Sequence, residues 1–159
     1  MTFLNSVLVA LSAGSLAASV VSAEEQTLRF KLVVSFTSNA EMQLASLPDQ
    51  SLAAHEAVGV AYFEDGRVAF KQFVISTAGG AEDGSYLGLS TYTFENGDSL
   101  TLKFNGGWTA EGQGGDYEVL SGAGAFEGAT GTGRFDSLED AWEDADLLEG
   151  SFSLDVPGS

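Results

Sequence analysis

The chain has 159 residues, which suits one domain with a single hydrophobic core, and its apolar fraction of 44% excludes a disordered chain. Six basic residues stand against 23 acidic ones, for a formal net charge of -17, so neither nucleic acid nor an anionic membrane surface is expected as a partner. The chain has no cysteine and one histidine, His55, which excludes disulfides, thiolate sites and histidine clusters within it. We therefore expect no metal and no cofactor, and we interpret His55 as an ordinary surface residue.

The chain begins with a leader that has no charged side chain. An apolar run over residues 7–21 ends in Val21-Ser22-Ala23, whose small residues resemble a signal-peptidase site, and a polar stretch starts at Glu24. Polar and small residues inside the run make it a poor membrane span. We predict a signal peptide over 1–23, a single domain over 24–159 and a secreted or periplasmic location. The alternative is a retained membrane tether, because the leader lacks the usual basic residue.

The residues after the leader are typical of strands and tight turns. In residues 28–37 the large apolar side chains alternate with a period of two, which indicates a half-buried strand. Asp65-Gly66 and Asn96-Gly97 predict tight hairpin turns, because these pairs accept the positive φ angles that such turns need.

Two stretches, 38–57 and 110–115, are interpreted as irregular, the first with a helical turn near 52–56. About eight strands at such short spacing predict an all-β sandwich or closed barrel, and closure removes unpaired edges. Beyond 28–37, the strands are expected over 58–63, 67–76, 85–94, 99–108, 116–120, 124–126, 130–135 and 151–156.

Residues 136–149 break the strand pattern with seven carboxylates. Their apolar residues follow helical spacing, with Asp136 or Ser137 as a cap and Gly150 as a stop. We predict a short acidic helix, or an ordered loop, that packs Trp142 against the barrel. The acidic face is expected to be solvated, and the alternative is a calcium site; the oxygen ligands would come from Asp140, Glu143, Asp144 and Asp146.

Two stretches carry a family resemblance. Residues 91–102 (TYTFENGDSLTL) and 117–135 (YEVLSGAGAFEGATGTGRF) resemble the hairpin and the glycine-rich strand pair of allene oxide cyclase barrel-like proteins, a superfamily that includes dirigent proteins and bacterial spirotetronate cyclases. The resemblance covers about residues 58–156 and implies a calycin-like, eight-stranded antiparallel β-barrel with an apolar lumen, often as a homo-oligomer. Residues 27–52 do not match the catalytic motif of allene oxide cyclase, so no catalytic residue is assigned.

The glycines of the second stretch are interpreted as structural. The third glycine of a dinucleotide fingerprint is absent, because Glu127 stands in its place, and no long helix follows. Tight strand bends are the better explanation for Gly122, Gly124, Gly128 and Gly131.

Four residues are candidates for lining the lumen. Tyr86, Ser90 and Tyr92 share one face of a predicted strand, and Lys71 lies on another strand. A lysine or tyrosine inside an apolar barrel has a shifted pKa and can polarise a carbonyl group. Lys71 and Lys103 can each point inward or outward, and outward is the usual orientation of a lysine.

Three functions remain open at this stage. The first is an isomerase or cyclase that shapes a small hydrophobic substrate in the lumen and excludes water. The second is a non-catalytic module that binds a small apolar ligand or a protein, and the third is a structural subunit of an extracytoplasmic assembly. An open lumen favours the first two, and a lumen filled with side chains favours the third, so whether the protein is an enzyme depends on the lumen.

Overall fold

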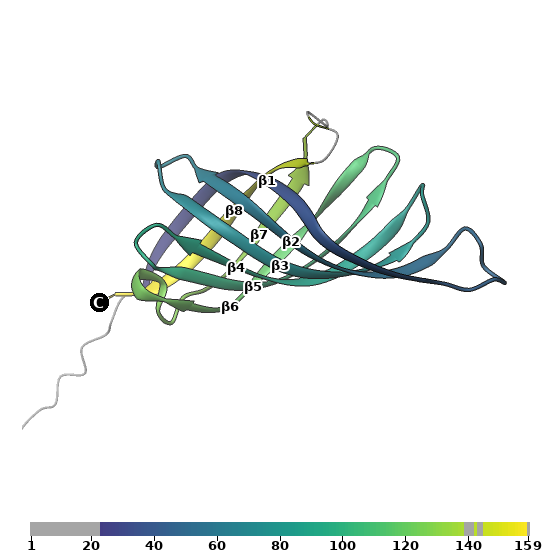
Figure 1. The fold of residues 1–159 in the computed structure, drawn as a ribbon. Helices are drawn as coiled ribbons and strands as arrows, with labels where there is room; N and C mark the ends of the chain where they lie inside the picture. The colour runs from purple at the N-terminus through teal and green to yellow at the C-terminus, as the bar shows by residue number, and fades with distance from the viewer. Residues whose placement is uncertain (1–22, 139–141, 143–144, 159) are drawn as a thin grey trace, which may run out of the picture.

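The computed structural model describes residues 23–138, 142 and 145–158, and these form a closed antiparallel barrel (Figure 1). Each strand pairs with the next along the chain, and β1 also pairs with β8, so the ring has no free edge. The expected eight-stranded barrel is confirmed. Its elements are β1 Ala23–Gln43, β2 Ser51–Phe63, β3 Val68–Gly79, β4 Gly84–Phe94, β5 Ser99–Thr109, β6 Gly112–Ala123, the short 3₁₀ helix η1 Gly124–Phe126, β7 Thr130–Ser137 and β8 Asp146–Pro157.

The core lies inside the ring because strand side chains alternate between the two faces. Along β1, Leu28, Phe30 and Leu32 are buried, while Arg29 and Lys31 between them are exposed. The other strands repeat this alternation, and their inner faces meet in one hydrophobic cluster. The lumen is thus a packed interior along much of its length. No helix in the described part of the chain is long and apolar enough to cross a membrane.

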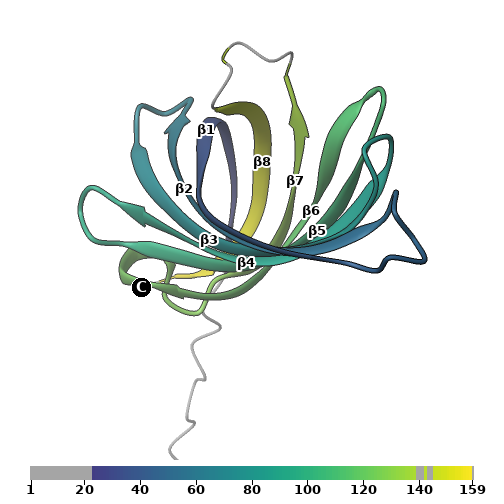
Figure 2. The same cartoon turned by 45° about the vertical axis from the view of Figure 1, so that its right-hand side comes forward.

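The two ends of the barrel differ. The end that holds the C-terminus and η1 is narrow, and Phe63, Phe94 and Phe126 stack there with ring centroids 5.1 Å apart in each adjacent pair. At the other end the strands splay, and the hairpins that join β1 to β2, β3 to β4 and β5 to β6 extend outward (Figure 2). We call this splayed end the wide mouth and define it by its inward-facing, partly exposed side chains: Phe36, His55, Ile75, Thr77 and Trp108.

The segments predicted as irregular are strands. β1 continues to Gln43 through a bulge between Phe36 and Ser38, and β2 begins at Ser51, so residues 38–57 form a long hairpin without the helical turn near 52–56. Both of its faces are exposed near the tip, so no apolar alternation marks it. The predicted loop 110–115 is mostly the start of β6, and the predicted strand 124–126 is η1.

The two ends of the acidic segment belong to strands β7 and β8. Asp136 and Ser137 end β7, and Gly150 lies inside β8, so the predicted cap and stop residues are strand residues and that part of the helix prediction is wrong. Trp142 is 55% exposed and bridges Ala145, so it does not pack into the core. Residues 139–141 and 143–144, which include three of the calcium candidates, lie outside the described residues; the fourth, Asp146, accepts a hydrogen bond from Gln113 Nε2 at 3.4 Å.

The two predicted hairpin turns are confirmed. Gly66 and Gly97 both have φ of +89°, and their amides donate to the carbonyl oxygens of Phe63 and Phe94 at 3.0 and 2.9 Å. An L-residue is strained at such angles, which explains why glycine follows Asp65 and Asn96.

Gly124→Ala is expected to lower the stability more than Gly66→Ala does. Both glycines have positive φ, but a Cβ at Gly66 meets nothing within 4 Å, whereas one at Gly124 would lie 2.0 Å from Asp98 Oδ1. That oxygen accepts a hydrogen bond from the Ala125 amide at 3.1 Å, so the substitution also breaks a turn contact. We expect about 1 kcal/mol for Gly66→Ala and roughly 2–3 kcal/mol for Gly124→Ala in urea unfolding. Equal losses in the two variants would contradict this structural role.

Candidate functional site

One lysine lies inside the barrel. Lys71 faces inward between Ala69 and Phe73 on β3, and only 3% of its surface is exposed. Its Nζ donates a hydrogen bond to Tyr117 Oη at 2.9 Å, and Tyr117 Oη lies 3.0 Å from Tyr92 Oη. Lys71 thus points inward, as its candidacy for the lumen requires, and the outward orientation that is usual for a lysine does not hold for this residue. It holds for Lys103, whose partly exposed side chain pairs with Glu118 at 2.6 Å on the outer face.

Aromatic rings surround the Lys71 amine. The ring centroids of Phe73, Phe104, Tyr92 and Tyr117 lie 4.5, 5.1, 5.2 and 5.2 Å from Nζ. Ring faces attract a cation, but they do not replace the water that an ammonium group loses on burial. Among the described residues, Lys71 and Ser90 are the buried polar or charged ones, so no carboxylate balances a charge here. We call Lys71, Tyr92 and Tyr117 the lumen triad.

Burial sets the proton affinities of the triad. Loss of hydration lowers the pKa of Lys71 from its ordinary value of 10.5 to about 7, because the charged form is penalised. The same loss raises the pKa of Tyr92 and of Tyr117, with the hydrogen bond between them a smaller influence. Near neutral pH the lumen thus combines an amine that is often uncharged with two phenols that keep their protons.

Two further polar groups lie near the triad. Ser90 Oγ is buried and has no hydrogen-bond partner in the part of the chain that the structure describes. Tyr86 lies toward the wide mouth, where its hydroxyl donates to the Gly114 carbonyl oxygen at 2.9 Å and its ring stacks on Trp108 at 6.3 Å. Trp108 Nε1 donates to the Gly80 carbonyl oxygen at 3.1 Å, so both rings are held in place.

The wide mouth leads toward the amine through Phe73. Phe36, which is 53% exposed, has its ring 6.3 Å from the ring of Phe73, and Phe73 in turn covers Lys71 Nζ. His55 belongs to the inner side of this mouth rather than to the outer surface, with its ring 5.2 Å from Phe36. A hollow of about 460 Å³ adjoins the mouth, and its lining includes Ser51, Thr77 and Trp108.

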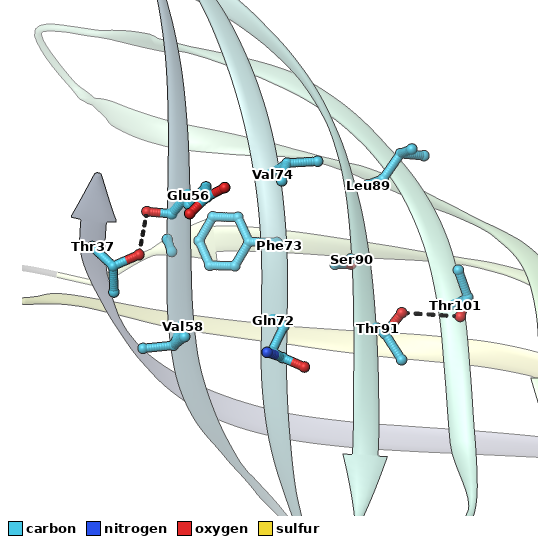
Figure 3. A pocket seen from close by; sticks show the side chains of 11 residues that line it. Thr37, Glu56, Val58, Gln72, Phe73, Val74, Leu89, Ser90, Thr91 and Thr101 are labelled. Carbon is cyan, nitrogen blue, oxygen red and sulfur yellow. Dashed lines mark hydrogen bonds between the residues drawn. The ribbon is translucent and has the colours of Figure 1, made fainter. Parts of the chain in front are cut away.

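A second hollow, of about 410 Å³, lies over the outer face of β1 to β5 (Figure 3). Its outward side chains include Gln72, Val74 and Leu89, whereas Phe73 and Ser90 belong to the buried inner faces of the same strands. The strand backbones therefore separate this groove from the triad. Three of its threonines are hydrogen-bonded: the hydroxyls of Thr91 and Thr101 lie 3.1 Å apart, and Thr37 Oγ1 donates to the Glu56 carbonyl oxygen at 3.1 Å.

All four predicted lumen residues face the inside of the barrel. Lys71 and Tyr92 are linked by hydrogen bonds to Tyr117. Ser90 lies one inward position before Tyr92 on β4, and Tyr86 lies further along the same face, near the mouth. Tyr117 was not among the candidates, although its alternation with Val119 in a short strand is a signal that was present. No group of three or more His, Cys, Asp or Glu residues suited to a metal ion occurs in the described ranges.

Comparisons with known proteins address the fold. No family model and no curated protein matches the chain. Among solved structures, the pterocarpan synthase dirigent protein GePTS1 aligns with a TM-score of 0.59 at 16% identity, over 92% of this chain and 98% of its own. A second pterocarpan synthase dirigent protein, PsPTS1, aligns with a TM-score of 0.61 at 14% identity, over 86% and 97% of the two chains. The fold is dirigent-like.

A third solved structure is also similar to this chain. It is a protein of unknown function from the DUF3224 family of Shewanella oneidensis MR-1, with a TM-score of 0.54 at 16% identity, over 87% of this chain and all of that one. These likenesses support a dirigent-like fold and do not single out the fold of allene oxide cyclase. At such identities they concern the fold alone.

Proposed function

We propose that this protein binds a small apolar molecule through its wide mouth and directs or catalyses a rearrangement of it, as an isomerase or cyclase does. The observation that carries the proposal is the lumen triad, an amine and two phenols held inside an apolar barrel beneath an aromatic opening. Protein interiors rarely contain a lysine without a charged partner, because burying it costs stability. Perturbed ionisable groups of this kind concentrate at functional sites.

The mouth supplies the binding surface in this proposal. Trp108 and Phe36 present apolar rings to an incoming molecule, and the polar groups below them can orient it. The phenols retain their protons at neutral pH and so can donate hydrogen bonds to a carbonyl or hydroxyl oxygen of the substrate. The barrel would contribute positioning and exclusion of water, and the triad would contribute polarisation.

Binding is tested with a neutral aromatic probe. Naphthylmethanol is titrated into a Trp142→Phe variant, in which Trp108 is the only tryptophan, and the tryptophan fluorescence is followed. Saturable quenching that is weakened by Phe36→Ala supports binding at the mouth. Fluorescence that does not respond to the probe, in a protein shown to be folded by circular dichroism, would refute it.

A non-catalytic role, as a binding module or as a structural subunit of an assembly, is the second candidate. It is favoured by the dense packing around the triad, where Phe104, Tyr117, Phe135 and Phe152 lie within 4.9–6.2 Å of one another in four ring pairs. A ligand that stays in the mouth would then never contact Lys71. The two candidates differ in whether Lys71→Met changes what happens to the bound molecule or leaves it unaffected.

Location and assembly complete the proposal. We expect export with cleavage after Ala23, so mass spectrometry of the exported protein should show an N-terminus at Glu24; an intact Met1 on detergent-extracted protein would favour the membrane tether instead.

We also expect copies of the chain to associate through the outer face of β3 and β4, where Val74, Leu87 and Leu89 are 50%, 55% and 50% exposed. Sedimentation as a monomer at micromolar concentration would argue against this association.

A further inference from the structure

We propose that Lys71 is a nucleophilic amine that forms an imine with a small apolar aldehyde or ketone that enters through the wide mouth. This inference rests on the proposed function and names its substrate class. The amine is buried, and its Nζ lies 2.9 Å from Tyr117 Oη, which in turn lies 3.0 Å from Tyr92 Oη. No buried carboxylate among the described residues accompanies the amine. A lysine built to bind an anion or to form a structural ion pair would not need this setting.

The surroundings of the Lys71 amine favour its uncharged form. The titratable groups that face it are Tyr92 from β4 and Tyr117 from β6, and Ser90 adds a hydroxyl. The buried positions of the other strands are apolar, such as Leu32 on β1, Ala61 on β2, Phe104 on β5, Phe135 on β7 and Phe152 on β8. A neutral amine is the form that attacks a carbonyl carbon, and desolvation of a lysine is an established way to obtain it.

The phenols provide the protons that imine formation requires. Nζ attacks the carbonyl carbon, and the carbonyl oxygen takes a proton to give a carbinolamine. Tyr117, at 2.9 Å from Nζ, is placed to protonate the departing hydroxyl, which leaves as water, and to recover a proton from the nitrogen. The overall change is amine plus carbonyl to imine plus water. Ser90, which pairs with Phe73 in the strand register and whose Oγ has no hydrogen-bond partner among the described residues, offers a second hydroxyl donor.

Phe73 controls access to the amine in this scheme. Its ring lies between the exposed Phe36 at the mouth and Nζ, 4.5 Å away. A carbonyl compound resting on Phe36 and Trp108 reaches Nζ once the Phe73 ring turns aside. Phe73→Ala is therefore expected to speed imine formation several-fold, as removing a gate does, rather than to abolish it.

The experiment uses two matched probes on the full chain. Naphthaldehyde is incubated with the protein near neutral pH in the presence of cyanoborohydride, a hydride donor that reduces an imine to a stable secondary amine. Peptide mass mapping then locates the adduct. Naphthylmethanol, which has the same ring system without a carbonyl group, reports binding alone. Lys71→Met removes the amine, and Lys103→Met removes a partly exposed lysine that is paired with Glu118.

The expected result is an adduct at Lys71 that is absent from Lys71→Met and unchanged in Lys103→Met. At about pH 7 the neutral fraction of Lys71 exceeds that of an ordinary surface lysine by on the order of a thousandfold, so labelling should favour Lys71 despite its burial. Binding of both probes without an adduct at Lys71, or with adducts at Lys31, Lys103 and the N-terminus instead, overturns the imine and leaves the proposed function intact. Failure of both probes to bind removes the proposed function itself.

Discussion

Replacing Lys71 with methionine is expected to stabilise the protein by up to about 5 kcal/mol near and below pH 7, the equivalent of a pKa lowered from 10.5 to about 7. Methionine keeps the unbranched stem of the side chain and removes the group that resists burial. Replacing a buried charge with an apolar residue of similar volume is commonly neutral or stabilising. The size of the effect is comparable to the whole stability of many small domains.

The pH dependence gives the sharper test. Between about pH 7 and pH 10.5 the unfolded chain binds a proton at Lys71 that the folded chain does not, so wild-type stability rises with pH across this window. Below pH 7 both states are protonated and the full penalty applies. Above pH 10 the raised pKa values of Tyr92 and Tyr117 act in the opposite sense, because the unfolded chain loses phenolic protons first, and stability falls.

Urea unfolding of three proteins over this pH range separates the contributions. The wild type and Lys103→Met should both gain stability from pH 7 toward pH 10, since Lys103 is partly exposed and paired with Glu118 at the surface. Lys71→Met should lack that gain, and its advantage over the wild type should shrink as pH rises. Parallel curves for all three proteins would mean that Lys71 is charged or hydrated in the folded state, which contradicts a dry lumen.

The barrel could be predicted from the sequence because apolar residues alternate with a period of two in most strands. In addition, Asp65-Gly66 and Asn96-Gly97 mark two tight turns. It did not predict the extensions of β1 and β2, whose residues are exposed on both faces near the hairpin tip, so burial imposes no pattern on them. The helix prediction for the acidic segment, with Gly150 as its stop, was wrong for a related reason. Gly150 occupies an inward position of β8 without a side chain, which hides its alternation with Leu148 and Phe152.

The site was only partly predictable for a physical reason that Lys71 illustrates. Phe70 and Val74 place apolar residues on the outer face of β3, where they are 45% and 50% exposed, so hydrophobicity alone does not say which face is inside. Only the pairing of Lys71 with Gly59 and Tyr92 in the closed ring decides its orientation. The contact with Tyr117 spans 46 residues and depends on the whole barrel, which no local pattern encodes.

Phe152→Ala is expected to cost about 3–5 kcal/mol, the range typical of a fully buried phenylalanine. Phe152 is completely buried, and its ring lies 4.9 Å from Phe30, 5.3 Å from Tyr92 and 5.2 Å from Tyr117. Phe70→Ala, which truncates the same side chain on the outer face of β3, should cost less than about 1 kcal/mol in the same urea measurement. Similar losses of stability in the two variants would show that packing inside the barrel does not contribute more to stability than packing on its outer face.

Phe152→Ala also tests the triad, because the space that the ring vacates lies against the rings of Tyr92 and Tyr117. A cavity that touches phenol hydroxyls and an amine has the polar partners that a buried water requires. Hydration restores the charged form of the amine, so the pKa of Lys71 should move from about 7 back toward 10.5. The midpoint of aldehyde labelling at Lys71 against pH measures this shift. Phe152→Leu, which keeps most of the apolar volume, should leave the midpoint near 7; a midpoint that stays near 7 in Phe152→Ala as well would mean that the dryness of the amine does not depend on the aromatic packing above it.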